Sequence, residues 1–144
     1  MKSRVLSPGE GRALNVLGDR VVVRLSGEET EGAFSLIEQT STPGMGIPLH
    51  THANEDELFF VIEGAMQFQI GDQTVEAPAG TAAWLPRGLP HSFKAVGETP
   101  ATASVTILPA GMEKMLEELG ALPVGAPDME KALAICERFG VRFA

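Results

Sequence analysis

The three histidines of the chain are spaced so that they could share one metal ion. His50 and His52 are two residues apart, and residues i and i+2 of a strand point to the same face, so both imidazoles can reach one point. Glu57 opens the next predicted strand after a short turn, and His91 opens another strand further along. Three imidazoles and one carboxylate form a nitrogen and oxygen site for a divalent first-row metal, with one or two coordination positions left for water, dioxygen or substrate. A lone histidine would be a surface or core residue by default, but the combination favours a metal site.

Short predicted strands separated by turns must position these residues. Residues 21–23 are three valines, a β-branched run that favours a strand. Residues 57–63 are apolar at both parities, which predicts a strand covered on both faces. In all, strands are expected at 20–25, 32–40, 57–63, 66–70, 73–76, 81–85, 91–96 and 101–108. Such regular spacing, interrupted by glycine and proline, indicates a β-sandwich or barrel.

The last third of the chain has a helical pattern instead. Apolar residues at helical spacing predict one helix, with the stripe Met112, Met115, Leu116 and Leu119. A second helix opens at Pro127 and Asp128 and carries the stripe Met129, Ala132, Leu133 and Cys136, with Gly140 as its C-terminal cap. We expect both helices to pack on the outside of the β domain, with their methionines filling the core and Cys136 buried as an apolar residue.

Composition excludes several classes of protein. The chain of 144 residues has 11 basic and 19 acidic residues, a formal charge of −8, and no basic stripe, which argues against nucleic acid and anionic membranes as partners. One cysteine cannot form an internal disulfide, and no apolar run approaches the roughly 20 residues that a membrane span needs. The start of the chain lacks an apolar signal core, so we expect a cytoplasmic protein. One domain, residues 1–144, is expected, with the barrel at about 11–110 and the helical segment at about 111–140.

Two stretches of the chain resemble the motifs of the cupin family. The first motif is matched in spacing by Gly44, His50, His52, Glu57 and Gly64. The second is matched by Gly80, Pro86, Gly88 and His91, with Ala95 at a position where the family has asparagine. Fifteen residues, 65–79, separate the motifs, as in compact members of the family. The flanking strands and the C-terminal helices are also similar to small quercetin-dioxygenase-like cupins.

The resemblance implies a mainly all-β fold, a cupin-type double-stranded β-helix or jelly-roll barrel, with two C-terminal α-helices packed outside. It implies that His50, His52, Glu57 and His91 bind one divalent transition metal, which the ligands alone do not identify among Fe, Mn, Ni, Co, Cu and Zn. It also implies a homodimer. The strand at 20–25 is a candidate interface, although pairing within the chain accounts for its valines equally well.

Two other carboxylates in the same acidic run, Glu55 and Asp56, are alternative candidates for the metal ligand. We expect Glu57 to be the ligand because it occupies the motif position and begins the apolar strand. Glu55 and Asp56 are expected to be solvated loop residues, since unpaired charges are rarely buried.

Apolar residues around the expected ligands are candidates for substrate binding. Period two places Phe59 and Val61 on the face of Glu57, and Phe93 on the face of His91. The complete candidate set is Phe59, Val61, Met66, Phe68, Trp84 and Phe93, and core packing is the alternative for each. Gln67 and Gln69 could contact a ligand or face outward, while Arg24 and Arg87 are expected to be exposed. A pocket without an inward charge favours an apolar or aromatic small molecule.

Three functions fit these expectations. The first is a metal-dependent dioxygenase, in which Glu57 could also act as a catalytic base if its pKa is raised. The second is a non-catalytic small-molecule-binding or sensor protein, favoured by the small size and by the lack of a further acid, base or nucleophile. The third is a lyase, isomerase or decarboxylase acting on a sugar or organic acid, which would need an arginine or lysine inside the pocket.

Overall fold

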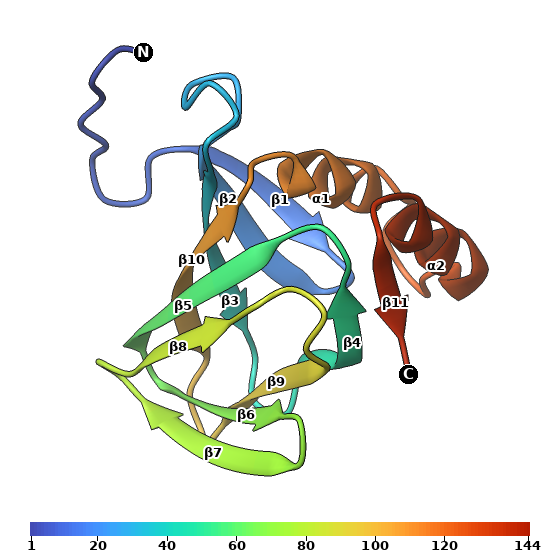
Figure 1. Ribbon diagram of the computed structural model, residues 1–144. Coiled ribbons are helices and arrows are strands. Elements are labelled where there is room, and N and C mark those ends of the chain that lie inside the picture. The colour runs from blue at the N-terminus through green and yellow to red at the C-terminus, as the bar shows by residue number, and fades with distance from the viewer.

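A computed structural model describes residues 1–144, which form eleven strands and two helices (Figure 1). The first six strands are β1 (Arg12–Val16), β2 (Asp19–Leu25), β3 (Ser35–Ser41), β4 (Gly46–His52), β5 (Asp56–Glu63) and β6 (Ala65–Ile70). The next four are β7 (Gln73–Pro78), β8 (Ala82–Leu85), β9 (His91–Val96) and β10 (Ala101–Leu108). The chain then continues through α1 (Met112–Gly120), α2 (Met129–Arg138) and β11 (Val141–Phe143).

The strands form two antiparallel sheets. One sheet has the order β1-β2-β3-β10-β5-β8, and the other has the order β11-β4-β9-β6-β7. Both helices lie beside one end of this arrangement, next to β1 and β11 (Figure 1). The mainly all-β barrel with two C-terminal helices outside it is therefore confirmed. Neither helix has the length and apolar character that a membrane-spanning helix requires.

Alternating side chains of both sheets form the core. Along β10 every second residue is buried, as expected for a strand with one face toward the core. Phe59 of the first sheet lies between Phe68 and Phe93 of the second, with ring centroids 5.3 and 5.1 Å away. These aromatic contacts join the two sheets across the interior.

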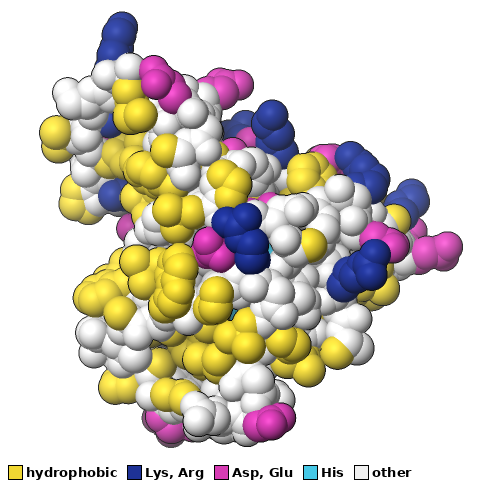
Figure 2. Space-filling view, in the orientation of Figure 1, with side chains coloured by type: hydrophobic (Ala, Val, Ile, Leu, Met, Phe, Trp, Pro, Cys, Tyr) yellow, Lys and Arg dark blue, Asp and Glu magenta, His cyan; other side chains and the backbone are white.

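The outer face of β5 departs from the prediction that this strand is covered on both faces. Leu58, Phe60 and Ile62 are 40–48% exposed, and Trp84 of β8, which pairs with Leu58, is 52% exposed. Figure 2 shows apolar side chains gathered over β5 and β8. In an antiparallel sheet only one face needs to meet the core, and apolar residues at both parities do not show whether the second face has a covering layer.

The C-terminal segment agrees with the predicted helices only in part. All four stripe residues of α1 are buried, and so are Ala132 and Cys136 of α2. Met129 and Leu133 are exposed, so the prediction that they face the core is wrong. The reason is that α2 packs mainly against α1 and the short strand β11, which cover a narrow stripe of the helix.

The valine strand β2 is hydrogen-bonded on both of its edges. It pairs with β1 on one side and β3 on the other, and Val21, Val22 and Val23 are all buried. Pairing within the chain therefore accounts for these valines. β1 and β11 were not among the expected strands, and β4 was expected only as the strand that carries His50 and His52.

Candidate metal centre

Two strands of one sheet and one strand of the other bring the four expected ligands together. His50 and His52 end β4, His91 begins β9 directly opposite His50, and Glu57 lies at the start of β5. β4 and β9 belong to the five-stranded sheet, and β5 belongs to the six-stranded sheet. The candidate centre therefore lies between the sheets, at one end of the shared interior.

A β-bulge in β4 turns the two histidines inward. Ile47 pairs with Phe93 and His50 pairs with His91, so three steps along β4 match two steps along β9. Pro48 lies in this irregular stretch, where its missing N–H costs the ladder no regular hydrogen bond. Because of the extra residue, both Ile47 and His50 contact the interior, which strict alternation would forbid.

The geometry of the four side chains fits a metal ion. Their candidate ligand atoms all lie within 4.8 Å of one another, and each residue is at most 4% exposed. Two ligands on opposite sides of one ion, each about 2.1 Å away, would lie about 4.2 Å apart. The cluster needs to contract only slightly to close on an ion.

The polar atoms of the cluster point to a common centre. Glu57 Oε1 lies 3.0 Å from His52 Nε2 and 3.2 Å from His91 Nε2. Yet Glu57 Oε1 and His91 Nε2 are both buried without a well-directed hydrogen bond. Buried polar atoms are rarely left unpaired, and a cation at the centre would satisfy both.

Backbone carbonyls fix the orientation of two imidazoles. His50 Nδ1 lies 2.8 Å from the Pro48 carbonyl oxygen, and His91 Nδ1 lies 3.0 Å from that of Leu89. A carbonyl can only accept, so each Nδ1 carries the hydrogen, and in the neutral ring Nε2 keeps its lone pair. Both histidines therefore present a metal-binding nitrogen to the cluster.

Burial and neighbouring charges set the protonation of the metal-free cluster. Burial, with repulsion from His91 and His52, lowers the pKa of His50 to about 4, so this ring is neutral near pH 7. Burial opposes a charge on His52, but its contacts with Glu55 and Glu57 outweigh burial and raise its pKa to about 9. Burial likewise opposes charge on Glu57, but His52 and His91 outweigh it and lower the Glu57 pKa to about 2. The metal-free site thus holds an ionised carboxylate beside a protonated His52.

The loop that precedes His91 is fastened to the start of β5. Arg87 donates from its backbone N–H, Nε and Nη2 to the Asp56 carboxylate at 2.8, 3.1 and 3.0 Å. The Gly88 N–H donates to the His52 carbonyl at 2.8 Å, with Gly88 at a positive φ of 81° that favours glycine. Asp56 is therefore an ion-paired strand residue rather than a free loop carboxylate, and the Arg87 guanidinium lowers its pKa.

Glu55 contradicts the prediction of a solvated loop residue. It is only 7% exposed, and its Oε2 lies 3.7 Å from His52 Nδ1. The turn between β4 and β5 is short enough to carry this carboxylate back over the histidine that precedes it. A nearby imidazole makes its burial possible.

The structure separates the candidate substrate-binding residues into two groups. Phe59, Val61, Met66, Phe68 and Phe93 lie on the inner faces and are fully or almost fully buried in the core. Trp84 lies on the outer face of β8, away from the other five.

The polar candidates also lie outside the cluster. Gln67 donates to Glu76 at 2.7 Å, and Gln69 is exposed. Arg24 donates to the carbonyls of Ser7 and Glu10, so it is mostly covered by the N-terminal segment, contrary to the expected exposure.

Phe143 is a neighbour of the cluster that sequence reasoning missed. It pairs with His50 across β11 and β4, and its ring centroid lies 5.6 Å from that of His50. The apolar, basic, apolar order of Val141, Arg142 and Phe143 after Gly140 was the available signal for this strand.

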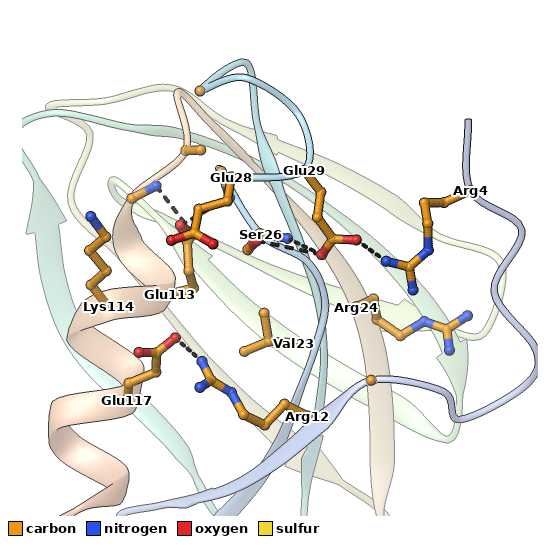
Figure 3. A pocket seen from close by; sticks show the side chains of 15 residues that line it. Arg4, Arg12, Val23, Arg24, Ser26, Glu28, Glu29, Glu113, Lys114 and Glu117 are labelled. Atoms are coloured by element: carbon orange, nitrogen blue, oxygen red, sulfur yellow. Dashed lines mark hydrogen bonds and ion pairs between the residues drawn. The ribbon is translucent and has the colours of Figure 1, made fainter. Parts of the chain in front are cut away.

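Three cavities, of about 650, 360 and 230 Å³, are lined by none of the four cluster residues. The largest lies between the end of β2, the N-terminal segment and α1 (Figure 3). Four of its charged residues form two ion pairs, Arg12 with Glu117 and Arg4 with Glu29. Almost no histidine surface is visible in Figure 2. The cluster is thus an enclosed site.

Comparisons with known proteins support the family that the motifs resemble. Residues 37–107 match the family model for the cupin domain. Over 90 residues the chain is 26% identical to quercetin 2,3-dioxygenase of Bacillus subtilis, a match that covers 62% of this chain and 27% of that protein. The chain therefore spans about a quarter of the length of this curated relative.

Solved structures share the fold. A predicted oxalate decarboxylase from Thermotoga maritima is 22% identical, with a TM-score of 0.66, over 74% of this chain and 99% of that one. KdgF from Halomonas sp. is 15% identical, with a TM-score of 0.68, over 77% of this chain and 99% of that one. The match of residues 37–107 to the cupin domain, together with the two-sheet topology and the cluster of three histidines and one glutamate, supports a small protein of the cupin superfamily.

Proposed function

We propose that the protein binds one divalent first-row transition metal through His50, His52, Glu57 and His91 and acts as an oxygenase on an apolar or aromatic small molecule. The observation that carries the proposal is the cluster of four buried ligand atoms within 4.8 Å of one another. Imidazole and carboxylate ligands suit iron, manganese, nickel, cobalt, copper and zinc. The likeness to quercetin 2,3-dioxygenase supports the type of reaction.

The protein's own residues would bind and orient. His50 and His91 supply Nε2 lone pairs in rings that backbone carbonyls hold in place. A bound ion would act as a Lewis acid that polarises a substrate oxygen. The pKa of Glu57, about 2 in the metal-free protein, suits a permanently ionised ligand. A general base at neutral pH needs a higher pKa, so we assign Glu57 to metal binding first.

The surroundings of the cluster favour an apolar ligand. Phe143 lies beside His50, and the interior next to the cluster is built from Phe59, Phe68 and Phe93. Arg87 is held by Asp56, and Arg24 by the N-terminal segment. An organic acid would need a cation in the pocket, so lyase or decarboxylase chemistry on such a substrate has less support.

A non-catalytic binding protein is the second candidate function. It is favoured by the enclosure of the cluster, whose residues are at most 4% exposed, because a metal that serves the fold needs no open path for a substrate. Such a protein would hold its ligand without transforming it. A compound that raises the melting temperature and is recovered unchanged would support this alternative.

The decisive experiment measures metal content and oxygen uptake together. We expect one metal ion per chain in the native protein and none in the His50→Ala/His52→Ala variant. Thr51→Ala, which alters the residue between the two histidines, should keep the ion, while circular dichroism checks the fold of both variants. The iron-, manganese- and nickel-loaded proteins should consume oxygen with flavonols or 1,3-diketones. Stoichiometric metal in the double variant would refute the site, and no uptake across the panel would refute the oxygenase.

A further inference from the structure

We propose that Glu55 is a positioning residue of the metal centre, whose carboxylate accepts a hydrogen bond from His52 Nδ1 and holds Nε2 of that imidazole toward the ion. This inference rests on the proposed metal site and deepens it. Glu55 is not among the four residues whose ligand atoms cluster. It would act on the ion only through His52.

The three histidines differ in what holds the nitrogen that faces away from the cluster. For His50 and His91 the partner of Nδ1 is a backbone carbonyl two residues earlier in the chain, of Pro48 and Leu89 respectively. His52 Nδ1 has no hydrogen-bond partner although it is buried. Two of the three rings are therefore fixed by the backbone, and the third needs another acceptor.

Glu55 offers that acceptor. Its Oε2 is also buried without a hydrogen-bond partner, and it lies 3.7 Å from His52 Nδ1. Burying a polar atom without a partner is costly, and these two atoms would satisfy each other. A side-chain shift of about one ångström brings the pair to the usual length of a charge-assisted hydrogen bond, about 2.8 Å.

The two carboxylates that follow Glu55 in the chain face other groups. Asp56 is bound by Arg87, and Glu57 Oε1 faces His52 Nε2 and His91 Nε2. When Nε2 of a neutral His52 binds an ion, its one hydrogen must be on Nδ1, which faces Glu55. A carboxylate partner fixes the ring and makes the histidine a stronger ligand than a carbonyl partner does.

The test compares cobalt(II) binding in the wild type and in three variants. Glu55→Ala removes the acceptor, and Glu55→Gln keeps an acceptor oxygen and the side-chain volume. Glu63→Gln, at the exposed far end of β5, removes the same charge elsewhere. The dissociation constant is measured by competition with a chelator, and the visible absorption of bound cobalt reports its ligand geometry.

We expect Glu55→Ala to raise the dissociation constant by about 10- to 100-fold, the usual effect of losing such a partner, and to change the cobalt spectrum. Glu55→Gln should fall between Glu55→Ala and the wild type, and Glu63→Gln should stay within twofold of the wild type. Should Glu55→Ala fail to fold, Glu55→Gln carries the test.

Two results would overturn the inference alone: wild-type affinity and spectrum in the Glu55 variants, or an equal loss of affinity in Glu63→Gln. Failure of the wild type to bind cobalt would instead overturn the proposed metal site, and the inference with it.

Discussion

The two faces of β5 carry similar apolar side chains but differ in their exposure to solvent. Phe59 and Val61 on the inner face are 1% and 0% exposed, whereas Phe60 and Ile62 on the outer face are 48% and 46% exposed. The most polar of the inward-facing residues, Glu57, is buried at the end of the same inner face. Apolar character therefore does not identify the buried face of this strand. The face is identified by Glu57, the expected metal ligand, which lies on it.

The neighbouring strand shows the ordinary pattern. β10 pairs with β5 along most of its length, with Ala103, Val105 and Ile107 buried and the residues between them half-buried. The departure is confined to the outer side of β5 and β8, where Leu58 and Trp84 face each other. This exposed apolar face is separate from the metal end of β5. Exposed apolar patches on a protein surface commonly have a function.

The largest change in stability should come from removing a large side chain from the inner face of β5. Phe59→Ala should reduce the free energy of unfolding by about 3–5 kcal/mol, because the ring fills the space between the sheets. Phe60→Ala, one residue away, should change it by no more than about 0.5 kcal/mol. Urea denaturation of both variants measures the difference. Equal losses would mean that the outer face is covered in solution.

Metal should stabilise the polar end of the inner face by a smaller amount. At a free metal concentration of one hundred times the dissociation constant, the free energy of unfolding should rise by about 2.7 kcal/mol. Adding a chelator in excess should remove the gain in a thermal unfolding experiment. The His50→Ala/His52→Ala variant is the control, and a comparable gain in that variant would place the ion elsewhere.

Metal affinity should depend on pH because His52 must lose a proton to bind. Its pKa of about 9 in the metal-free protein is above its ordinary value, so the ring is mostly protonated at pH 7 and metal must displace that proton. The dissociation constant should therefore fall by up to tenfold, about 1.4 kcal/mol, between pH 7 and 8, and level off above about pH 9. Titration calorimetry at several pH values checks this, and a constant affinity would contradict it.

The smallest effect should come from the outer face of β8. Trp84 is the single tryptophan of the chain and is 52% exposed, so acrylamide should quench the fluorescence of the native protein readily. Trp84→Ser should change the free energy of unfolding by no more than about 0.5 kcal/mol. Protection from acrylamide in the wild type would show that this face is covered.

The metal ligands could be predicted from the sequence because their arrangement is mostly local. A strand fixes the relative directions of His50 and His52, and the chain has a single further histidine. The strands β2, β3 and β5 to β10 and the stripe of α1 could be predicted from apolar pattern and periodicity. The bulge at Pro48, which turns the histidines inward, depends on pairing with β9 and could not be read from β4 alone.

The remaining features depend on contacts between distant parts of the chain. β11 is three residues long, and it forms by pairing with β4, about ninety residues earlier in the chain. Met129 and Leu133 follow the periodicity of a buried stripe but lie beyond the reach of the elements that α2 packs against. Glu55 is a charged residue in a turn, which predicts exposure to solvent, and its burial is explained only by the position of His52.

The location of the metal centre between the sheets has a consequence for how fast the protein would unfold. His50 and His91 belong to one sheet and Glu57 to the other, so a bound ion would tie the two layers together as a removable cross-link. Separating the layers would then require breaking coordination bonds as well as opening the aromatic core. Such a tie raises the barrier to unfolding, so metal would set the lifetime of the native state as well as its equilibrium stability.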